Sequence, residues 1–226
     1  MQSVLKLVAC VLAATAALHA FERTLDVQTL DQAVRIGQSR FDAERTALHR
    51  PYRLDVGRAP VDWIDIVTPF RRVVLEAELH TRNGGRLFGQ REALAILGPM
   101  PERVDVVVDL TFHPLNTFIG VPSYDVVLEG AVAPSGTGTP AVRAGVVRPG
   151  HLDRVPRFGA RVSGNNLPYP YQGNTGLARG SEPLTGGVIV AQFDGGELDA
   201  AGVYYVVISD GANELARARV DLGRLR

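Results

Sequence analysis

The sequence predicts an α+β fold in which an N-terminal helical segment packs on a C-terminal antiparallel β-sandwich. Before about residue 100, apolar residues recur at helical spacing between helix start and stop signals. From Pro101 onward, period-two alternation and Gly or Pro turn residues dominate, which is typical of antiparallel sheets packed in two layers. We therefore expect a signal peptide over 1–20, a helical segment over 21–100 and a β-sandwich domain over 101–226.

The first twenty residues have the order of a secretory signal peptide. Lys6 precedes an apolar segment of about twelve residues, and the small residue Ala20 precedes Phe21. A bilayer span needs roughly 20 residues, so we expect no transmembrane span in the mature chain. The predicted location is periplasmic or secreted. Lipoprotein anchoring at Cys10 is disfavoured, because too short an apolar region precedes that cysteine.

Composition excludes several classes of function. Cleavage after Ala20 removes the only cysteine, so the mature chain would have no disulfide, no thiol nucleophile and no thiolate metal site. The 24 basic and 24 acidic residues are interspersed, which argues against a nucleic-acid partner. Gly136 to Pro140 lacks the lysine and the following helix of a phosphate-binding loop. We expect no cofactor.

The expected helices follow in order along the segment 21–100. Thr29 to Gln32 has the form of a capping box, and the helical pattern that follows breaks or kinks near Gly37 and ends at His49. Residues 61–67 are interpreted as an extended lead-in to the clearest helix. That helix begins at Thr68-Pro69, and residues 90–97 form one more.

The expected strands begin with residues 104–112, where Asp105 and Asp109 alternate with inward apolar residues and face solvent. A second alternating strand covers 124–129. Shorter strands are expected over 142–147, 157–162 and 188–193. Residues 203–209 form an apolar run typical of a strand covered on both faces, and Asp210-Gly211 then turns the chain into a last, half-covered strand.

Asp199-Ala-Ala-Gly202-Val-Tyr204, followed by a strand, resembles the corner before the penultimate strand of immunoglobulin-like sandwiches. The resemblance covers about 25 residues and lacks the cysteine pair and intervening tryptophan of antibody domains. It implies an immunoglobulin-like β-sandwich in which the Tyr204 hydroxyl bonds back to the loop backbone. It transfers no functional residue.

Candidate catalytic residues lie where the first long strand ends. Asp105, Asp109 and His113 cannot meet at one atom, because strand residues four apart are separated by about 13 Å. His113, Asn116 and Ser123 converge only if the following loop folds back, and they are the candidates for a polar catalytic pocket.

Two further segments carry candidate binding residues. Asp194, Glu197 and Asp199 offer three carboxylates on a glycine-rich turn, but a plain turn explains them better than a calcium site does. The long connection 164–187 has the length of a binding loop. Its candidate binding residues are Asn165, Asn166, Tyr169 and Tyr171. The alternative for the two tyrosines is packing across an open end of the sandwich.

The missing catalytic signatures and the predicted export favour a non-enzymatic binding or interaction module with a protein or envelope partner. The alternative is a secreted hydrolase or carbohydrate-active enzyme with a site near His113. A closed pocket that brings a carboxylate or a serine to His113 would favour the enzyme. An open, solvated His113 would favour the module.

Overall fold

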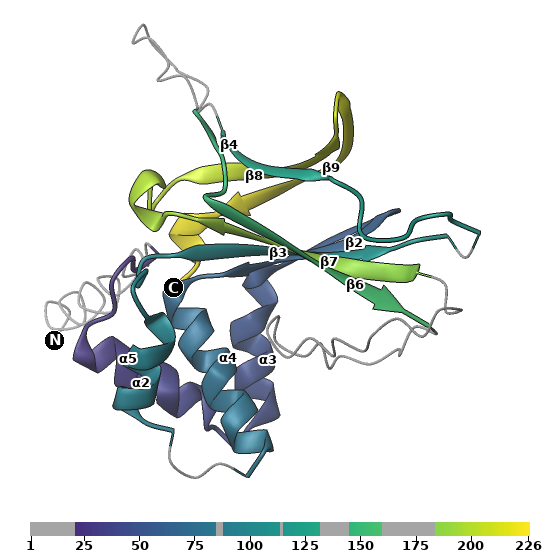
Figure 1. Ribbon diagram of the computed structural model, residues 1–226. Coiled ribbons are helices and arrows are strands. Elements are labelled where there is room, and N and C mark those ends of the chain that lie inside the picture. The colour runs from purple at the N-terminus through teal and green to yellow at the C-terminus, as the bar shows by residue number, and fades with distance from the viewer. Residues whose placement is uncertain (1–20, 85–87, 114, 132–144, 160–183) are drawn as a thin grey trace, which may run out of the picture.

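A computed structural model describes residues 21–84, 88–113, 115–131, 145–159 and 184–226. In this part of the chain, four α-helices and two antiparallel sheets form a mixed α+β fold (Figure 1). The helices lie beside the larger sheet, and the smaller sheet lies on that sheet's other side (Figure 1). The prediction of a mixed helix-and-sheet fold is confirmed, while the predicted signal peptide lies outside the described residues.

The helices are α2 (Val27–Gly37), α3 (Asp42–His49), α4 (Pro69–Arg82) and α5 (Gln90–Leu97). Helix α2 begins earlier than predicted, because the carboxylate of Asp26 caps it by accepting from the Thr29 N-H at 2.7 Å. The predicted break at Gly37 is its last residue. Thr68 caps α4 as predicted, with its hydroxyl accepting from the Arg71 N-H at 3.3 Å.

The larger sheet has the strand order β1-β2-β3-β7-β6. Its strands are β1 (Arg53–Arg58), β2 (Val61–Val67), β3 (Val104–Thr111), β6 (His151–Phe158) and β7 (Leu184–Phe193). The smaller sheet has the order β5-β4-β8-β9. Its strands are β4 (Asp125–Gly130), β5 (Val146–Val147), β8 (Val203–Asp210) and β9 (Asn213–Asp221). Short 3-10 turns occupy Arg50–Tyr52, Gly195–Glu197 and Leu222–Arg224.

The segment 21–100 is only partly helical, because it supplies strands β1 and β2. Strand β2 pairs with β3 in a register that places Ile64 opposite Val108. The stretch 61–67, interpreted from the sequence as a lead-in, is therefore an interior strand of the larger sheet. The larger sheet thus draws on residues from both sides of position 101.

One hydrophobic core lies between the two sheets. Ile64, Val108 and Ile189 of the larger sheet and Leu128 and Val206 of the smaller sheet are all at most 2% exposed and belong to one cluster. Phe21 and Leu225, at the two ends of the described chain, are also buried in this cluster. Burial of this apolar surface from both sheets is the main force that holds the sheets face to face.

A second, smaller core joins the helices, and a narrow apolar seam joins the helices to the larger sheet. Leu30, Phe70 and Val74 are buried in the helical core. The seam consists of Val67, Val107 and Val190, against which Leu75 of α4 and Val188 pack. The outer face of the larger sheet therefore rests partly on α4.

Strand β8 lies between β4 and β9, as an interior strand should. Its inward residues Tyr204, Val206 and Ile208 are buried. On the outer face Val207 is buried, but Val203 and Tyr205 are only half-buried. The expectation that both faces would be covered is therefore met fully on the inner face and only in part on the outer face. The β8–β9 hairpin turns at Gly211, whose φ of 57° suits glycine.

The prediction that Asp105 and Asp109 face solvent is wrong. Their side chains point to the outer face of the larger sheet, but they are only 1% and 3% exposed. Asp105 lies under Arg72 of α4, and Asp109 lies under Arg157 of β6. Buried carboxylates need such partners, and Arg72 and Arg157 are distant in sequence from the aspartates that they pair with.

Candidate functional site

The connection between β3 and β4 is the most distinctive surface of the described chain, and Asn116 fastens it to the sheet. The Asn116 side-chain amide donates to the carbonyls of His113, at 2.7 Å, and Leu184, at 2.8 Å. Its side-chain oxygen accepts from the Phe118 N-H at 3.0 Å. One side chain thus bonds to both limbs of the loop and to the first residue of β7, which restricts the conformations open to the loop.

Aromatic and apolar contacts hold the rest of this connection. The ring of Phe118 meets that of Phe112 edge to face at 5.1 Å, and Phe112 is buried in the main core. Val121 fills the space over Gly187, where an added Cβ would lie 2.4 Å from a Val121 methyl carbon. The loop is therefore anchored at its middle and on its return limb.

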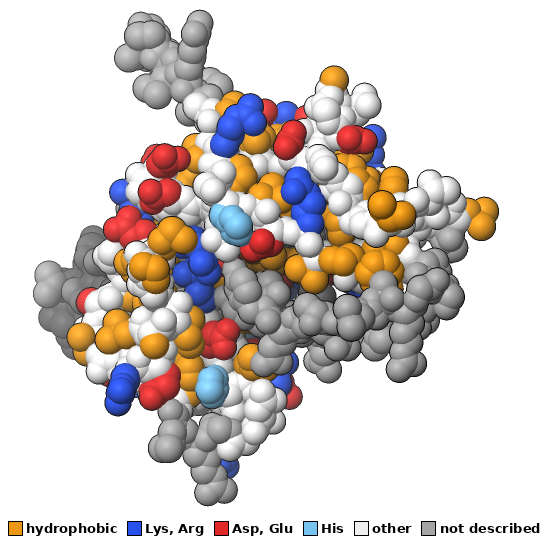
Figure 2. Space-filling view, viewed as in Figure 1, with side chains coloured by type: hydrophobic (Ala, Val, Ile, Leu, Met, Phe, Trp, Pro, Cys, Tyr) orange, Lys and Arg blue, Asp and Glu red, His pale blue; other side chains and the backbone are white. Residues whose placement is uncertain are grey.

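Two large apolar side chains nevertheless project from this anchored loop. Leu115 is 84% exposed and Ile119 is 97% exposed, while Phe118 is 44% exposed. In Figure 2, hydrophobic side chains gather at the end of the molecule where the β3–β4 connection projects, away from the helices. We call Leu115, Phe118 and Ile119 the apolar tip. An anchored loop that holds apolar groups in water is typical of a contact surface.

The segment that carries the apolar tip has no charged side chain. The sequence from 114 to 124 contains no acidic or basic residue. At the base of the loop, the Arg154 guanidinium donates to the Tyr124 carbonyl at 3.0 Å. Burial, and to a smaller extent the nearby Asp210 carboxylate, raises the pKa of Tyr124. The Tyr124 side chain therefore stays neutral around pH 7.

The structure does not assemble a catalytic pocket from His113, Asn116 and Ser123. The His113 ring is exposed, and its Nδ1 accepts from the Leu115 N-H at 3.1 Å. Ser123 is exposed too, and the amide of Asn116 is committed to the backbone bonds described above. Among the described residues, no carboxylate and no serine bonds to the His113 ring.

Two of the three candidate calcium carboxylates accept hydrogen bonds from backbone N-H groups of their own turn. Asp194 accepts from the Gly196 N-H at 2.8 Å, and Asp199 accepts from the Ala201 N-H at 3.1 Å. Glu197 is exposed to solvent. No group of three potential metal ligands occurs in the parts of the chain that the structure describes. The candidate binding residues Asn165, Asn166, Tyr169 and Tyr171 lie outside the described residues.

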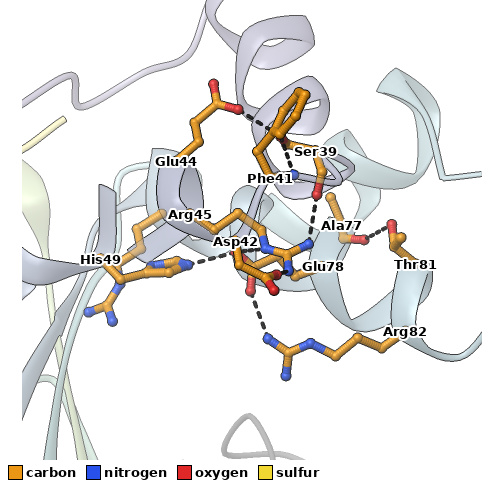
Figure 3. A network of polar contacts seen from close by, with 11 residues as sticks. Ser39, Phe41, Asp42, Glu44, Arg45, His49, Ala77, Glu78, Thr81 and Arg82 are labelled. Carbon is orange, nitrogen blue, oxygen red and sulfur yellow. Dashed lines mark hydrogen bonds and ion pairs between the residues drawn. The ribbon is translucent and has the colours of Figure 1, made fainter. Parts of the chain in front are cut away.

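A polar network joins α3 to α4 around the carboxylate of Glu78, which is 3% exposed (Figure 3). His49 Nε2 lies 2.7 Å from one Glu78 oxygen, and Arg82 donates to the other at 3.0 Å. Arg45 lies 4.0 Å from the carboxylate. These donors around one buried carboxylate stabilise the contact between the two helices.

A histidine beside a buried carboxylate is also the arrangement of a general base, but here both ring nitrogens are occupied. Nε2 donates to Glu78, and Nδ1 accepts from Arg71 Nε at 3.4 Å. Arg71 in turn donates to Asp65 at 3.2 Å and to the Ile66 carbonyl at 2.7 Å. His49 therefore links α3 and α4 to β2, and no ring nitrogen is left for a substrate. The sequence correctly places His49 at the end of a helix, but its partners could not be predicted.

The buried aspartates on the outer face of the larger sheet are likewise structural. Burial raises the pKa of the Asp105 carboxyl, and the nearby Arg72 and Arg103 offset this effect only in part. Arg72 donates to Asp105 at 3.3 Å and to the Arg103 carbonyl at 2.6 Å. Arg157 reaches both oxygens of Asp109, at 3.1 and 3.2 Å. Each carboxylate compensates a guanidinium and is not free for acid or base chemistry.

Comparison with known proteins adds no assignment: no family model, no curated protein and no solved structure matches the chain. None of the described helices combines the length and apolar character that a membrane span requires. The candidate site therefore depends on the geometry of the apolar tip alone.

Leu115, Phe118 and Ile119 were not predicted from the sequence as site residues. A signal was nevertheless present. These large apolar residues occur in an uncharged segment that no longer follows the alternation of the preceding strand. A buried strand would explain such residues equally well, and only their exposure in the fold distinguishes the two cases.

Proposed function

We propose that the mature protein is an exported, non-enzymatic interaction module that engages its partner through the apolar tip. One observation carries the proposal: an anchored loop holds Leu115 and Ile119 almost completely in solvent. Exposing such side chains without a partner brings no benefit to stability. Export is supported by the signal-like order of the first twenty residues.

We also assign the two facing sheets to the immunoglobulin-like class of sandwich. The assignment is supported by the shared core and by the Tyr204 hydroxyl, which accepts from the Asp199 N-H at 2.7 Å. That bond is the one that the resemblance to the tyrosine corner implies. Sandwiches of this class present loops at their ends, and many use those loops for binding.

The competing assignment, a hydrolase or carbohydrate-active enzyme near His113, has no such support. A solvated histidine whose Nδ1 accepts from its own loop is poorly suited to activating a nucleophile. The binding role of Asn165, Asn166, Tyr169 and Tyr171 stays a prediction. We expect the double change Tyr169→Ala and Tyr171→Ala to weaken partner capture without changing Tm. A large fall in Tm would favour the packing role instead.

Site-specific photocrosslinking in the native envelope tests the interaction module. A photoreactive side chain is introduced at position 119 and, as a matched control, at Leu94 of α5, which is also an exposed apolar residue, at 54%. We expect discrete adducts from position 119 and none from position 94. Equal labelling at both positions, or none at 119 together with turnover of a small substrate, would reject the module.

A further inference from the structure

We propose that the apolar tip engages the surface of a phospholipid bilayer, into which Leu115 and Ile119 insert. This inference rests on the proposed function and names the partner of the same surface. Three properties of the loop point to lipid: its convex shape, its lack of charge and the hydrogen bonds that Asn116 makes within it.

The shape of the tip favours a deformable surface. Leu115 and Ile119 both project almost completely into solvent, at 84% and 97% exposure, from a loop at one end of the molecule (Figure 1). A convex tip binds a folded protein only where a matching groove exists. A bilayer interface needs no such match, because lipids rearrange around an inserted side chain.

The chemistry of the loop lowers the cost of leaving water. No acidic or basic residue occurs between 114 and 124, so no side-chain charge must be moved into the interface. Asn116 meanwhile pairs with the Phe118 N-H and with two carbonyls, and the Phe112 N-H donates to the Thr185 carbonyl at 3.0 Å. Backbone groups that are already hydrogen-bonded cost less to transfer out of water than unpaired groups do.

The charges around the base of the loop indicate which lipid headgroups it would tolerate. Among the described residues there, exposed Arg58 and Arg154 are balanced by exposed Asp125 and Asp210. Such a mixed rim gives no net attraction to an anionic membrane. Binding should therefore depend on apolar insertion, work with zwitterionic lipid and change little with salt.

The experiment uses the mature protein and phosphatidylcholine vesicles, with binding measured by flotation at low and high salt. We expect the wild-type chain to float with vesicles under both conditions. The double variant Leu115→Ser and Ile119→Ser should bind at least about tenfold more weakly, since each change removes a large apolar group. The control Leu94→Ser should bind like the wild type. Far-UV circular dichroism and Tm verify that each variant is folded.

A second readout locates the inserted residue. Because the only cysteine of the chain is Cys10, Ile119→Cys in the mature protein gives a single site for an environment-sensitive fluorophore. Vesicles should shift its emission to the blue, and the same label at Leu94→Cys should not respond.

The proposal is overturned if the wild-type chain does not float, if the double variant floats equally well or if the label at 119 does not shift. Binding restricted to anionic vesicles and lost at high salt would also overturn it, because that is surface adsorption without insertion. A discrete protein adduct from position 119 combined with no vesicle binding would reject lipid while leaving the interaction module intact.

Discussion

At the scale of single residues, Tyr204 connects a local sequence pattern to a specific bond. Its ring is buried, and its hydroxyl accepts from the Asp199 N-H at 2.7 Å. Gly202 is required at the same corner, because an added Cβ would lie 2.8 Å from the Tyr204 ring and 3.0 Å from the Asp199 carbonyl. The corner therefore depends on an aromatic ring and on the absence of a side chain two positions earlier.

We expect Tyr204→Phe to lower the free energy of unfolding by about 1–2 kcal/mol, because the half-buried Asp199 N-H loses its acceptor. Urea denaturation measures the change. The neighbouring Tyr205→Phe is a matched control: the Tyr205 ring lies half-buried beside Arg217, and its change should have little effect. Equal losses from both variants would show that the hydroxyl bond at the corner has no special role.

The burial of Asp105 predicts how the free energy of unfolding changes with pH. Its pKa is raised by burial, so the folded state holds the proton more tightly than the unfolded state does. Stability contributed at this site is therefore largest below the unfolded value of about 3.9 and is lost as pH rises through the higher folded value. As pH rises between the unfolded and the folded pKa of Asp105, the free energy of unfolding of the wild-type chain should fall relative to that of the Asp105→Asn variant.

Denaturant titrations of both proteins at a series of pH values test this dependence. The difference between the two curves isolates position 105 from the other titrating groups. A difference that grows in favour of the wild type as pH rises would mean that Arg72 and Arg103 outweigh burial. In that case the folded pKa of Asp105 would be depressed.

Local patterns predicted some of these residues and not others, for a physical reason. The cap at Thr68 and the corner at Tyr204 involve partners within five positions, so their chemistry is visible along the chain. The Glu78 partner of His49 is 29 positions away, and the Arg157 partner of Asp109 is 48 positions away. A polar residue in an alternating strand is normally expected to face solvent, because polar residues are mostly exposed. Only the folded structure shows that such a residue is buried in an ion pair.

At the scale of elements, the contact between α2 and α4 depends on Gly37. An added Cβ would lie 2.5 Å from the Ala77 Cβ and 2.5 Å from the Val74 carbonyl. The close approach of the two helices therefore requires glycine at this position, for reasons of space and not of backbone conformation.

We expect Gly37→Ala to destabilise the protein by about 1–3 kcal/mol, the usual cost of overpacking. The gain in helix propensity, at most about 1 kcal/mol, does not offset the clash. Thermal unfolding followed at 222 nm measures the change. Gly150→Ala, where an added Cβ meets nothing within 4 Å, serves as the control. A stabilised Gly37→Ala protein would contradict the close contact.

Element prediction succeeded where one periodicity continued over a whole segment, as in α4 and β3. It failed for β1, whose residues alternate between exposed and half-buried and include Gly57 at a φ of 60°. Such an edge strand has too little apolar content to stand out. The apolar tip was missed for the opposite reason, because exposed and buried apolar residues look alike in a sequence.

At the scale of the whole molecule, the helices and the larger sheet are joined by charged contacts as well as by apolar packing. The apolar seam contains three buried valines. Around it, Arg71 pairs with Asp65 and Arg72 pairs with Asp105 across the same interface. Only Thr68 separates the end of β2 from the start of α4, so the chain itself also couples the two layers.

This coupling predicts a single cooperative unfolding transition. Trp63 of β2 is the only tryptophan, and the Arg53 guanidinium lies 4.0 Å from its ring, so its fluorescence reports on the larger sheet. Circular dichroism at 222 nm reports mainly on the helices. Because removal of one partner from a buried ion pair costs about 3–5 kcal/mol, the helical layer should not detach while the sheet is intact. The two signals should give coincident urea transitions in the wild-type protein.

Asp65→Asn tests the origin of the cooperativity. It leaves Arg71, whose side chain is only 5% exposed, without its carboxylate. We expect both midpoints to fall together by an amount that corresponds to about 1–3 kcal/mol, since the partly exposed Asp65 costs less to remove than a fully buried partner. Asp55→Asn, at an exposed position of neighbouring strand β1, should leave both midpoints unchanged. A helical signal that is lost at lower urea than the Trp63 signal in the wild type would show that the two layers unfold independently, and that the ion pairs orient the helices without stabilising the fold as a unit.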